Sequence, residues 1–273
     1  MRKRSLGLDL DLNVRLSAGW TVGRPGLVDV FMIAGQSNGR GRGSQYGAGK
    51  SETGYYYSGS IFSDLKDPVG DAANSGSRAD IGSAWPAFAK RWFELTGRKS
   101  VWIARASGGS YKVAGQTPTW DPATATLYTT AVNALNNAVA AVGADARFTL
   151  NKVYILWVQG ENEGTLIDAA TITAQQSEDA LTLVFNGFIA DVPTLDGIFV
   201  SELGRRRDNS REVAYSAERA NKADVCTAIG IAHLVWTGAK DLTDAQMKDV
   251  DHYATPGYNI MGIAMAEGAF ATL

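Results

Sequence analysis

From Leu27 onward, short apolar runs bounded by Gly or Ser alternate with longer stretches of helical periodicity. This alternation is typical of βαβ units built around a parallel sheet. The apolar runs are dense in Val, Ile, Leu and Phe, as expected of strands covered by helices on both faces. They predict strands at residues 28–35, 101–106, 153–158, 198–203 and 232–236. Helices are predicted near residues 84–96, 121–143, 168–190, 211–228 and 256–271. The pattern therefore predicts one α/β domain with a five-stranded parallel sheet.

Two segments do not follow this pattern. Residues 39–80 are rich in Gly, Ser and Tyr without sustained periodicity, so we expect a rim insertion over a site or a flexible excursion. Residues 1–27 precede the repeating units, and Leu or Val occupies every second position from Leu6 to Leu16. Such alternation is typical of a half-buried strand. It indicates an N-terminal strand extension of a domain at 28–273, either folded back on that domain or used for attachment or oligomerisation.

The composition excludes several classes of function. Charged residues make up 20% of the 273 residues, and a net charge of −2 gives no basic footprint for nucleic acid. The single cysteine, Cys226, excludes an internal disulfide and a multi-cysteine zinc site, and two histidines leave few ways to build a histidine metal centre. No stretch approaches the ~18 consecutive apolar residues of a membrane span. Because Asp9 and Asp11 interrupt the apolar part that a signal peptide needs, we expect a cytoplasmic or virion-associated protein.

Polar segments containing Gly follow the predicted strands. Ligands of an open parallel sheet bind outside the carboxyl ends of its strands, so these segments converge on one edge. Ser37 follows the first strand, and its hydroxyl needs a neighbouring base to become a nucleophile. His252, just before the last helix, is the candidate base. Asp249, three residues earlier, can accept a hydrogen bond from the second ring nitrogen of that histidine.

Donors for an oxyanion hole lie at the same edge. Gly108 and Gly109 can present backbone N–H groups, and Asn162 offers a side-chain amide. Taken alone, each feature has a simpler interpretation. A lone G-x-S-x-G is weak, a Gly-Gly pair is a common turn, and Glu161 and Glu163 are interpreted as solvated loop carboxylates rather than a metal pair. Their joint placement after successive strands is what favours a catalytic serine.

These segments resemble the sequence blocks of the SGNH (GDSL-like) hydrolases, specifically the carbohydrate esterase branch that includes sialate O-acetylesterases and acetylxylan esterases. The GQSN block matches IAGQSNGRG, the GG[ST] block ARASGGSY, the WxQGExD block WVQGENE and the DxxH block DVDHYATPGYNIMG. The resemblance runs from about residue 28 to about residue 270 and implies a three-layer α/β/α, flavodoxin-like fold. The chain departs from the family at Glu163, where Asp is usual, and at Ser83, where Pro is usual.

The resemblance implies hydrolysis of a small acyl ester, most often acetate, from a sugar hydroxyl through an acyl-enzyme, with no metal or organic cofactor. The implied catalytic triad is Ser37, His252 and Asp249. The implied oxyanion donors are the Ser37 N–H, a glycine of the pair Gly108 and Gly109, and either Gln159 or Asn162.

An α/β-hydrolase is the competing enzyme fold, because it also has a G-x-S-x-G serine and the chain order Ser, Asp, His. That fold places the serine after several strands and carries acid and base on separate loops. Here Ser37 follows the first strand of the repeating pattern, and Asp249 lies only three residues before His252. The spacing therefore argues against an α/β-hydrolase.

The expected partner is an acetylated oligo- or polysaccharide. Tyr56, Trp85 and Trp120 lie in or near predicted loops, where aromatic faces can stack on sugar rings, although packing roles are equally compatible with the sequence. Arg205 opens a run of three arginines that would favour an anionic glycan unless it is a solvated loop. Another class of function stays open: a structural or glycan-binding module of a phage tail or surface assembly, catalytic or not, joined to copies or to a phage particle through the N-terminal strand.

Overall fold

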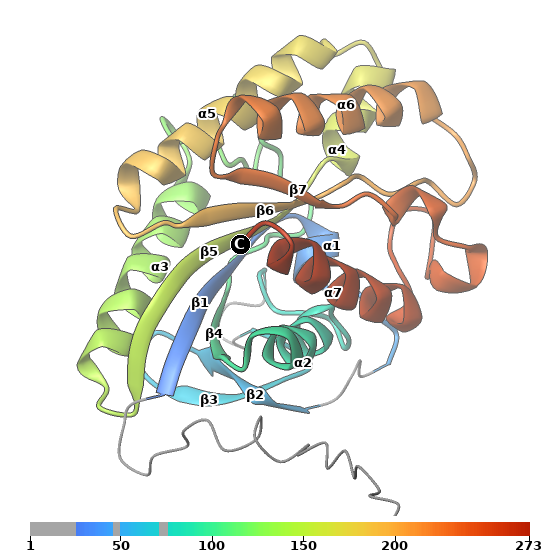
Figure 1. Ribbon diagram of the computed structural model, residues 1–273. Coiled ribbons are helices and arrows are strands. Elements are labelled where there is room, and N and C mark those ends of the chain that lie inside the picture. The colour runs from blue at the N-terminus through green and yellow to red at the C-terminus, as the bar shows by residue number, and fades with distance from the viewer. Residues whose placement is uncertain (1–25, 46–49, 71–75) are drawn as a thin grey trace, which may run out of the picture.

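One sheet runs through the described part of this computed structural model, which covers residues 26–45, 50–70 and 76–273 (Figure 1). Its strands are β1 (Gly26–Gly35), β2 (Lys50–Tyr57), β3 (Phe62–Lys66), β4 (Lys99–Ala104), β5 (Phe148–Val158), β6 (Gly197–Ser201) and β7 (Ala232–Trp236). Their order across the sheet is β3-β2-β4-β1-β5-β6-β7, and each neighbouring pair is parallel except β2 and β3. The α/β class and the five predicted strands are confirmed, and β1 begins two residues earlier than expected.

The predicted count of five strands is wrong, because the segment 39–80 contributes β2 and β3 to the sheet. The two strands pair antiparallel, and β2 continues the parallel sheet beside β4. The Tyr55 ring lies 5.2 Å from the Phe148 ring, and the Tyr57 ring lies 4.9 Å from the Phe62 ring. These aromatic contacts anchor β2 and β3 at the edge of the sheet. One face of these strands is exposed to solvent, so their sequence lacks a continuous apolar run.

The α-helices of the described chain are α1 (Ser37–Arg40), α2 (Trp85–Thr96), α3 (Thr126–Ala144), α4 (Glu161–Asp168), α5 (Ala174–Asp191), α6 (Glu212–Ala228) and α7 (Thr255–Phe270). Helix α3 starts later than predicted, because the Asp121 carboxylate accepts the Ala123 N–H at 3.2 Å and the Thr124 hydroxyl at 2.5 Å, which forms a turn. Helix α4 was not predicted, and it lies in the polar segment that follows β5. Each helix in the described part of the chain is too short or too polar to span a lipid bilayer.

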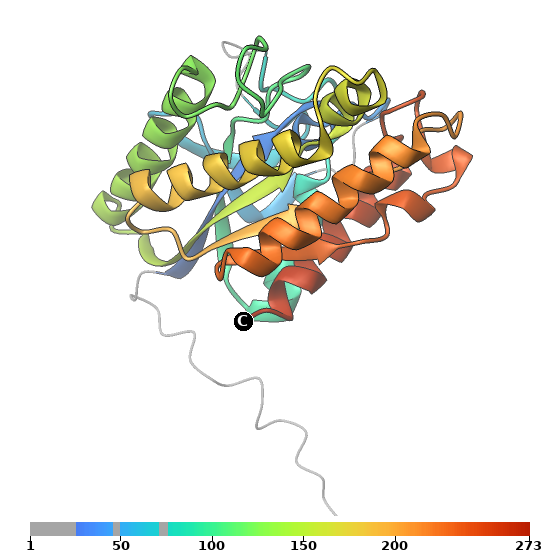
Figure 2. The ribbon, with the colours of Figure 1, turned by 90° about the horizontal axis from the view of Figure 1, so that it is seen from above.

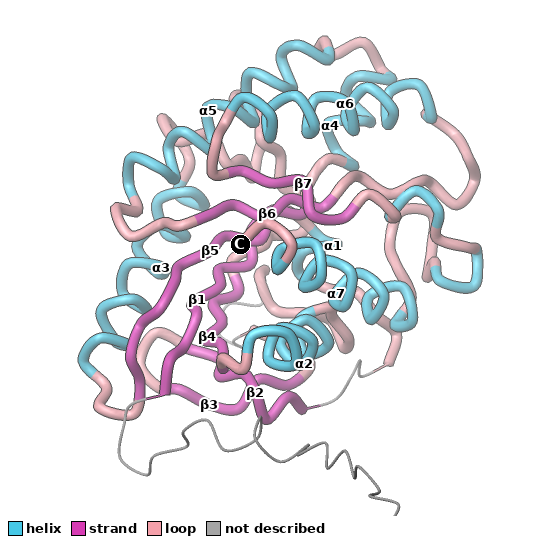
Figure 3. Tube along the Cα trace, viewed as in Figure 1, coloured by secondary structure: helices cyan, strands magenta, loops and turns pink. Residues whose placement is uncertain are grey.

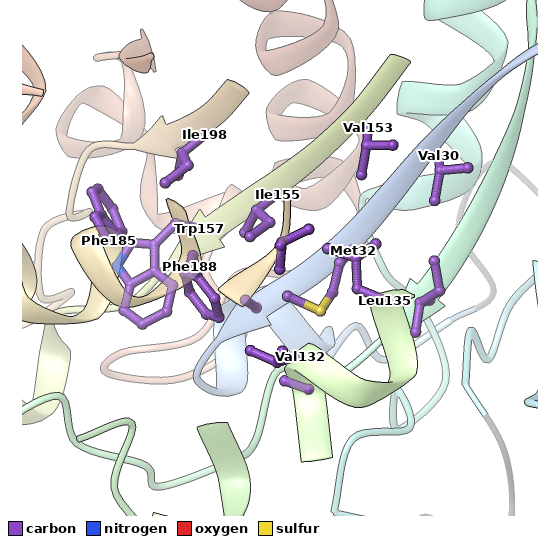
Figure 4. Close-up of a cluster of buried hydrophobic side chains, with 14 of the residues drawn as sticks. Val30, Met32, Val132, Leu135, Val153, Ile155, Trp157, Phe185, Phe188 and Ile198 are labelled. Carbon is purple, nitrogen blue, oxygen red and sulfur yellow. The ribbon is translucent and has the colours of Figure 1, made fainter. Parts of the chain in front are cut away.

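The side chains of β1 alternate between two apolar layers, one on each face of the sheet. Val30 and Met32 pack with α3 and α5 through residues such as Leu135 and Phe185 (Figure 4). Phe31 on the opposite face packs with α2 and α7. Figure 3 shows the strands as one layer between helices, and Figure 2 shows α5 and α6 side by side over one face. Because helices cover both faces of the sheet, the sequence of β1 contains a continuous apolar run. The predicted three-layer arrangement is confirmed.

The predicted N-terminal strand cannot be compared with the structure, because residues 1–25 lie outside the described part of the chain. Only Gly26 and Leu27 of that segment are described, and both belong to β1.

Candidate active site

A pocket of about 390 Å³ opens at the carboxyl ends of the central strands. Four segments line it: the turn after β1, the Gly108-Gly109 pair after β4, the first turns of α4 after β5, and the loop before α7. Because these strands are adjacent and parallel, their carboxyl ends meet at the same edge of the sheet. The fold therefore brings together segments that are more than 200 residues apart in the chain.

A sharp turn after β1 presents Ser37 to this pocket. Gly35 has a φ of +103°, and a Cβ atom there would lie 2.0 Å from the carbonyl oxygen of Val158, so the position accepts only glycine. The Gln36 N–H donates to the same Val158 oxygen at 2.8 Å, and the Gly41 N–H then donates to the Ser37 carbonyl oxygen at 2.9 Å, which closes the short helix α1. Ser37 is only 6% exposed, and the surface that it keeps faces the pocket.

The Ser37 hydroxyl, the His252 ring and the Asp249 carboxylate form one chain of hydrogen bonds. Ser37 Oγ lies 2.9 Å from His252 Nε2. On the other side of the ring, His252 Nδ1 lies 2.8 Å from Asp249 Oδ1 and 3.0 Å from Asp249 Oδ2. The geometry is that of a nucleophile, a base and an orienting acid.

The loop that carries His252 also fixes the orienting acid. Asp249 Oδ1 accepts the backbone N–H groups of His252 at 2.9 Å and Asp251 at 3.1 Å. Partial burial acts to raise the pKa of Asp249, but these backbone hydrogen bonds and the contact with His252 outweigh it and lower that pKa. The carboxylate therefore stays ionised beside the ring. The neighbouring Asp251 carboxylate faces away, toward Arg206 at 2.8 Å and the Tyr215 hydroxyl at 3.2 Å.

The two side chains considered for the oxyanion hole have different surroundings. Gln159 is 1% exposed, and its Nε2 donates to the Ser110 carbonyl oxygen at 2.8 Å and to Glu163. Both amide hydrogens of Gln159 are thus used away from the pocket. Asn162 lines the pocket, and its Nδ2 donates to the same Ser110 oxygen at 3.0 Å, which leaves the second hydrogen of that amide. Gly108 and Gly109 also line the pocket, the latter with a φ of +73°.

The residues considered for a substrate rim lie elsewhere. Trp85 and Trp120 are fully buried, and their indole N–H groups donate to the carbonyl oxygens of Gly39 at 2.8 Å and Gly35 at 3.2 Å. The rim prediction is wrong for both tryptophans, because neither ring has a free face. Tyr56 belongs to β2 and packs against the core on the α2 side.

Arg205 holds the loop after β6 rather than facing the pocket. Its Nε donates to the Leu242 carbonyl oxygen at 2.7 Å, and its guanidinium pairs with Asp244. The next arginine of the run, Arg206, pairs with Asp208 and Asp251. These two arginines therefore connect loops to one another. The expectation that Arg205 binds a glycan directly is not met.

The sequence of the chain matches a known enzyme family over nearly its whole length. Residues 27–271 match the family described as carbohydrate esterase, sialic acid-specific acetylesterase. The chain belongs to this family. The protein is therefore a carboxylic ester hydrolase that removes acetyl groups from carbohydrates, and a Ser-His-Asp mechanism is consistent with this family.

Solved structures share the fold of the esterase at low sequence identity. A protein of Arabidopsis thaliana is 17% identical with a TM-score of 0.66, and the match covers 89% of this chain and 98% of that one. The structure named NanS is 14% identical with a TM-score of 0.63, covering 92% of this chain and 98% of its own. No curated protein matches the chain at the level of sequence.

Two arginines of the esterase pocket were missed by sequence analysis. Arg40 and Arg42 line the pocket, and both pair with the Asp80 carboxylate, at 2.8 Å and 2.9 Å. Lys248 Nζ lies 3.9 Å from the same carboxylate. Three cations thus surround one carboxylate, and Arg40 Nε is buried without a hydrogen-bond partner among the described residues. The signal was present in the sequence, since Arg40 follows Ser37 by one helical turn.

The carboxylates after β5 are not solvated, contrary to expectation. Glu161 is 7% exposed and Glu163 is 0% exposed. Glu163 accepts hydrogen bonds from the Lys112 N–H at 2.6 Å and from the Gln159 amide. It therefore helps to hold the loop that contains Ser110. Glu161 lines the pocket and accepts a hydrogen bond from Asn38. Burial raises the pKa of both carboxyl groups.

Proposed function

We propose that Ser37 is the nucleophile of the esterase, His252 its general base and Asp249 the acid that orients the ring. The support is the continuous hydrogen-bond chain, with Ser37 Oγ 2.9 Å from His252 Nε2 and Asp249 Oδ1 2.8 Å from His252 Nδ1. Ser37 Oγ attacks the acetyl carbonyl carbon while His252 Nε2 takes the hydroxyl proton. The imidazolium then gives this proton to the departing sugar oxygen, which leaves an acetyl-enzyme.

The second half of the reaction uses the same groups in the reverse sense. A water molecule replaces the sugar, His252 Nε2 takes its proton, and the hydroxide attacks the acetyl carbon on Ser37 Oγ. The new tetrahedral intermediate collapses, acetate leaves, and the proton returns to the serine oxygen. Asp249 stabilises the imidazolium in both halves, because its lowered pKa keeps it ionised.

We assign the oxyanion donors to the Asn162 side chain and to the backbone N–H groups of Ser37 and Gly109, which all line the pocket, whereas the Gly108 N–H donates to the Gly76 carbonyl oxygen at 3.4 Å. Each such donor typically contributes about 3–4 kcal/mol to transition-state stabilisation. Gln159 is not among them, since both of its amide hydrogens are bound to Ser110 and Glu163. Its part is to hold the Ser110 carbonyl oxygen, which also accepts the Asn162 amide.

The substrate that fits this pocket best is an acetylated sugar that carries a carboxylate, such as an O-acetylated sialic acid. The family description names sialic acid, and Arg40 and Arg42 provide cationic groups beside the nucleophile. The single negative charge of Asp80 neutralises only part of the positive charge of the two arginines, because Lys248 also lies next to this carboxylate. A guanidinium recognises a sugar carboxylate by paired, charge-assisted hydrogen bonds.

Initial rates with 4-nitrophenyl acetate test the catalytic assignment. We expect Ser37→Ala and His252→Ala each to lower kcat by on the order of 10³-fold or more, and the double variant to be no slower than either. Additive losses, or wild-type turnover in Ser37→Ala, would contradict the triad.

A pair of sugar substrates tests the arginine assignment. Arg42→Gln should lower kcat/KM for O-acetylated sialic acid by about tenfold while changing it by less than about threefold for an acetylated neutral hexose. Lys248→Gln is the matched control, because it removes one charge from the same cluster at a residue that does not line the pocket. Equal losses on both sugars with Arg42→Gln would contradict carboxylate recognition.

A further inference from the structure

Asn38, the residue after the nucleophile, uses its whole side-chain amide in hydrogen bonds, and it is only 1% exposed. Its Nδ2 donates to the Asp251 carbonyl oxygen at 2.9 Å and to the Glu161 carboxylate. Its Oδ1 accepts the Tyr253 N–H at 3.4 Å and the Tyr258 hydroxyl at 2.8 Å. A carboxamide has two donors and two acceptor lone pairs, so this side chain is saturated.

Two of these four bonds reach the peptide groups on either side of His252. The carbonyl oxygen of Asp251 precedes the histidine, and the N–H of Tyr253 follows it. One rigid, planar amide therefore holds the backbone both before and after the base. Since Asn38 also sits directly after Ser37 in α1, it fixes the position of the His252 backbone relative to the nucleophile.

The same two bonds determine which way the amide points. The Tyr253 N–H can only donate and the Asp251 carbonyl can only accept, so Oδ1 must face Tyr253 and Nδ2 must face Asp251. Glu161 supports this orientation by accepting from Nδ2, and Tyr258 supports it from α7. Glu161 Oε2 is buried with no hydrogen-bond partner among the described residues, and burial raises the pKa of this carboxyl group.

We propose that Asn38 is a positioning residue that sets the contact between Ser37 Oγ and His252 Nε2 by holding both peptides that flank His252. The proposal rests on the catalytic roles assigned above. A displacement of about 1 Å at a reacting group can cost on the order of 10² in rate. Loss of this hold should therefore lower kcat and leave KM nearly unchanged, because Asn38 does not line the pocket.

The test changes the hydrogen-bond donors and acceptors at positions 38 and 161. Asn38→Asp keeps the shape but replaces the donor with an oxygen that faces both Glu161 and the Asp251 carbonyl. We expect kcat for 4-nitrophenyl acetate to fall by on the order of 10²-fold and the melting temperature to fall as well. Adding Glu161→Gln supplies an amide that can donate to the new carboxylate. This double variant restores the bond between positions 38 and 161 but not the donation to Asp251.

The outcomes distinguish positioning from a purely structural role. The proposal predicts that the double variant regains at least about half of the lost melting temperature while its kcat stays more than about tenfold below wild type. Recovery of kcat in step with the melting temperature would overturn it. Inactive wild-type protein, or full activity in Ser37→Ala, would instead refute the assigned catalytic roles on which the proposal depends.

Tyr258→Phe serves as the matched control, since it removes one hydrogen bond to Asn38 and the acceptor of the Arg42 N–H but leaves both bonds to the histidine loop. We expect a loss of melting temperature with less than about a threefold change in kcat for 4-nitrophenyl acetate. If this variant slows turnover as much as Asn38→Asp, the hold on the flanking peptides is not what sets the rate, and the proposal fails.

Discussion

Asp249 and Asp251 lie two residues apart in the same loop, yet only Asp249 reaches the His252 ring. Replacing Asp249 with Asn keeps the shape and removes the negative charge that stabilises the imidazolium. The new amide can also present an N–H to His252 Nδ1, which favours the wrong tautomer of the ring. The change therefore weakens the base without removing it, and turnover should fall while the fold persists.

The size of the loss follows from the exposure of the carboxylate. The Asp249 side chain is 46% exposed, so water screens its charge more than it would in a buried triad. A hydrogen bond to a charged group is worth about 1.5–3 kcal/mol, which corresponds to about 10- to 150-fold in rate. We therefore expect Asp249→Asn to lower kcat by about 10²-fold, less than Ser37→Ala or His252→Ala.

Steady-state kinetics with 4-nitrophenyl acetate measure this loss, and Asp251→Asn is the matched control. The Asp251 carboxylate pairs with Arg206 and Tyr215 rather than with the histidine. Its replacement should cost less than about tenfold in kcat, by loosening the loop. A greater loss with Asp251→Asn than with Asp249→Asn would refute the assigned acid.

Two further predictions concern residues around the site. Asn162→Ala should lower kcat by about 10²-fold with little loss of stability, whereas Gln159→Ala should lower the free energy of unfolding by about 2 kcal/mol. Steady-state kinetics and urea unfolding measure the two effects. The reverse pattern would mean that Gln159 is the oxyanion donor and Asn162 the supporting residue. Burial lowers the pKa of Lys222 to about 8 against the opposing charges of Glu218 and Glu161. The folded state then binds fewer protons than the unfolded state above that pH, so the unfolding free energy gains about 2 kcal/mol between about pH 7.5 and about pH 9.5. Lys222→Met should remove this gain, and an unchanged pH dependence in that variant would contradict the lowered pKa.

The central sheet could be predicted because its strands are buried on both faces. Strands such as β1 and β5 contain continuous runs of Val, Ile, Leu and aromatic residues, which stand out from any helical pattern. The edge strands β2 and β3 are half-exposed and contain Gly and charged residues, so no apolar run marks them. Their identity depends on pairing with β4 and on aromatic contacts with β5, which are distant in sequence.

The segments of the site could be predicted because parallel topology gathers strand ends at one edge. The surroundings of individual side chains could not. Trp120 follows a loop in sequence but packs against Trp157 and Phe188 in the core. Glu161 begins a polar segment, yet the fold buries it beside Asn38. Both outcomes depend on tertiary contacts that leave no local pattern in the sequence.

The most direct measurement of the central claim is to label the nucleophile covalently. The esterase is incubated with a 4-nitrophenyl phosphonate ester, digested, and analysed by mass spectrometry for the modified residue. The triad predicts a single adduct on Ser37, absent from Ser37→Ala and formed at a rate lower by on the order of 10³-fold in His252→Ala. An adduct on another serine, together with wild-type turnover in Ser37→Ala, would contradict the account.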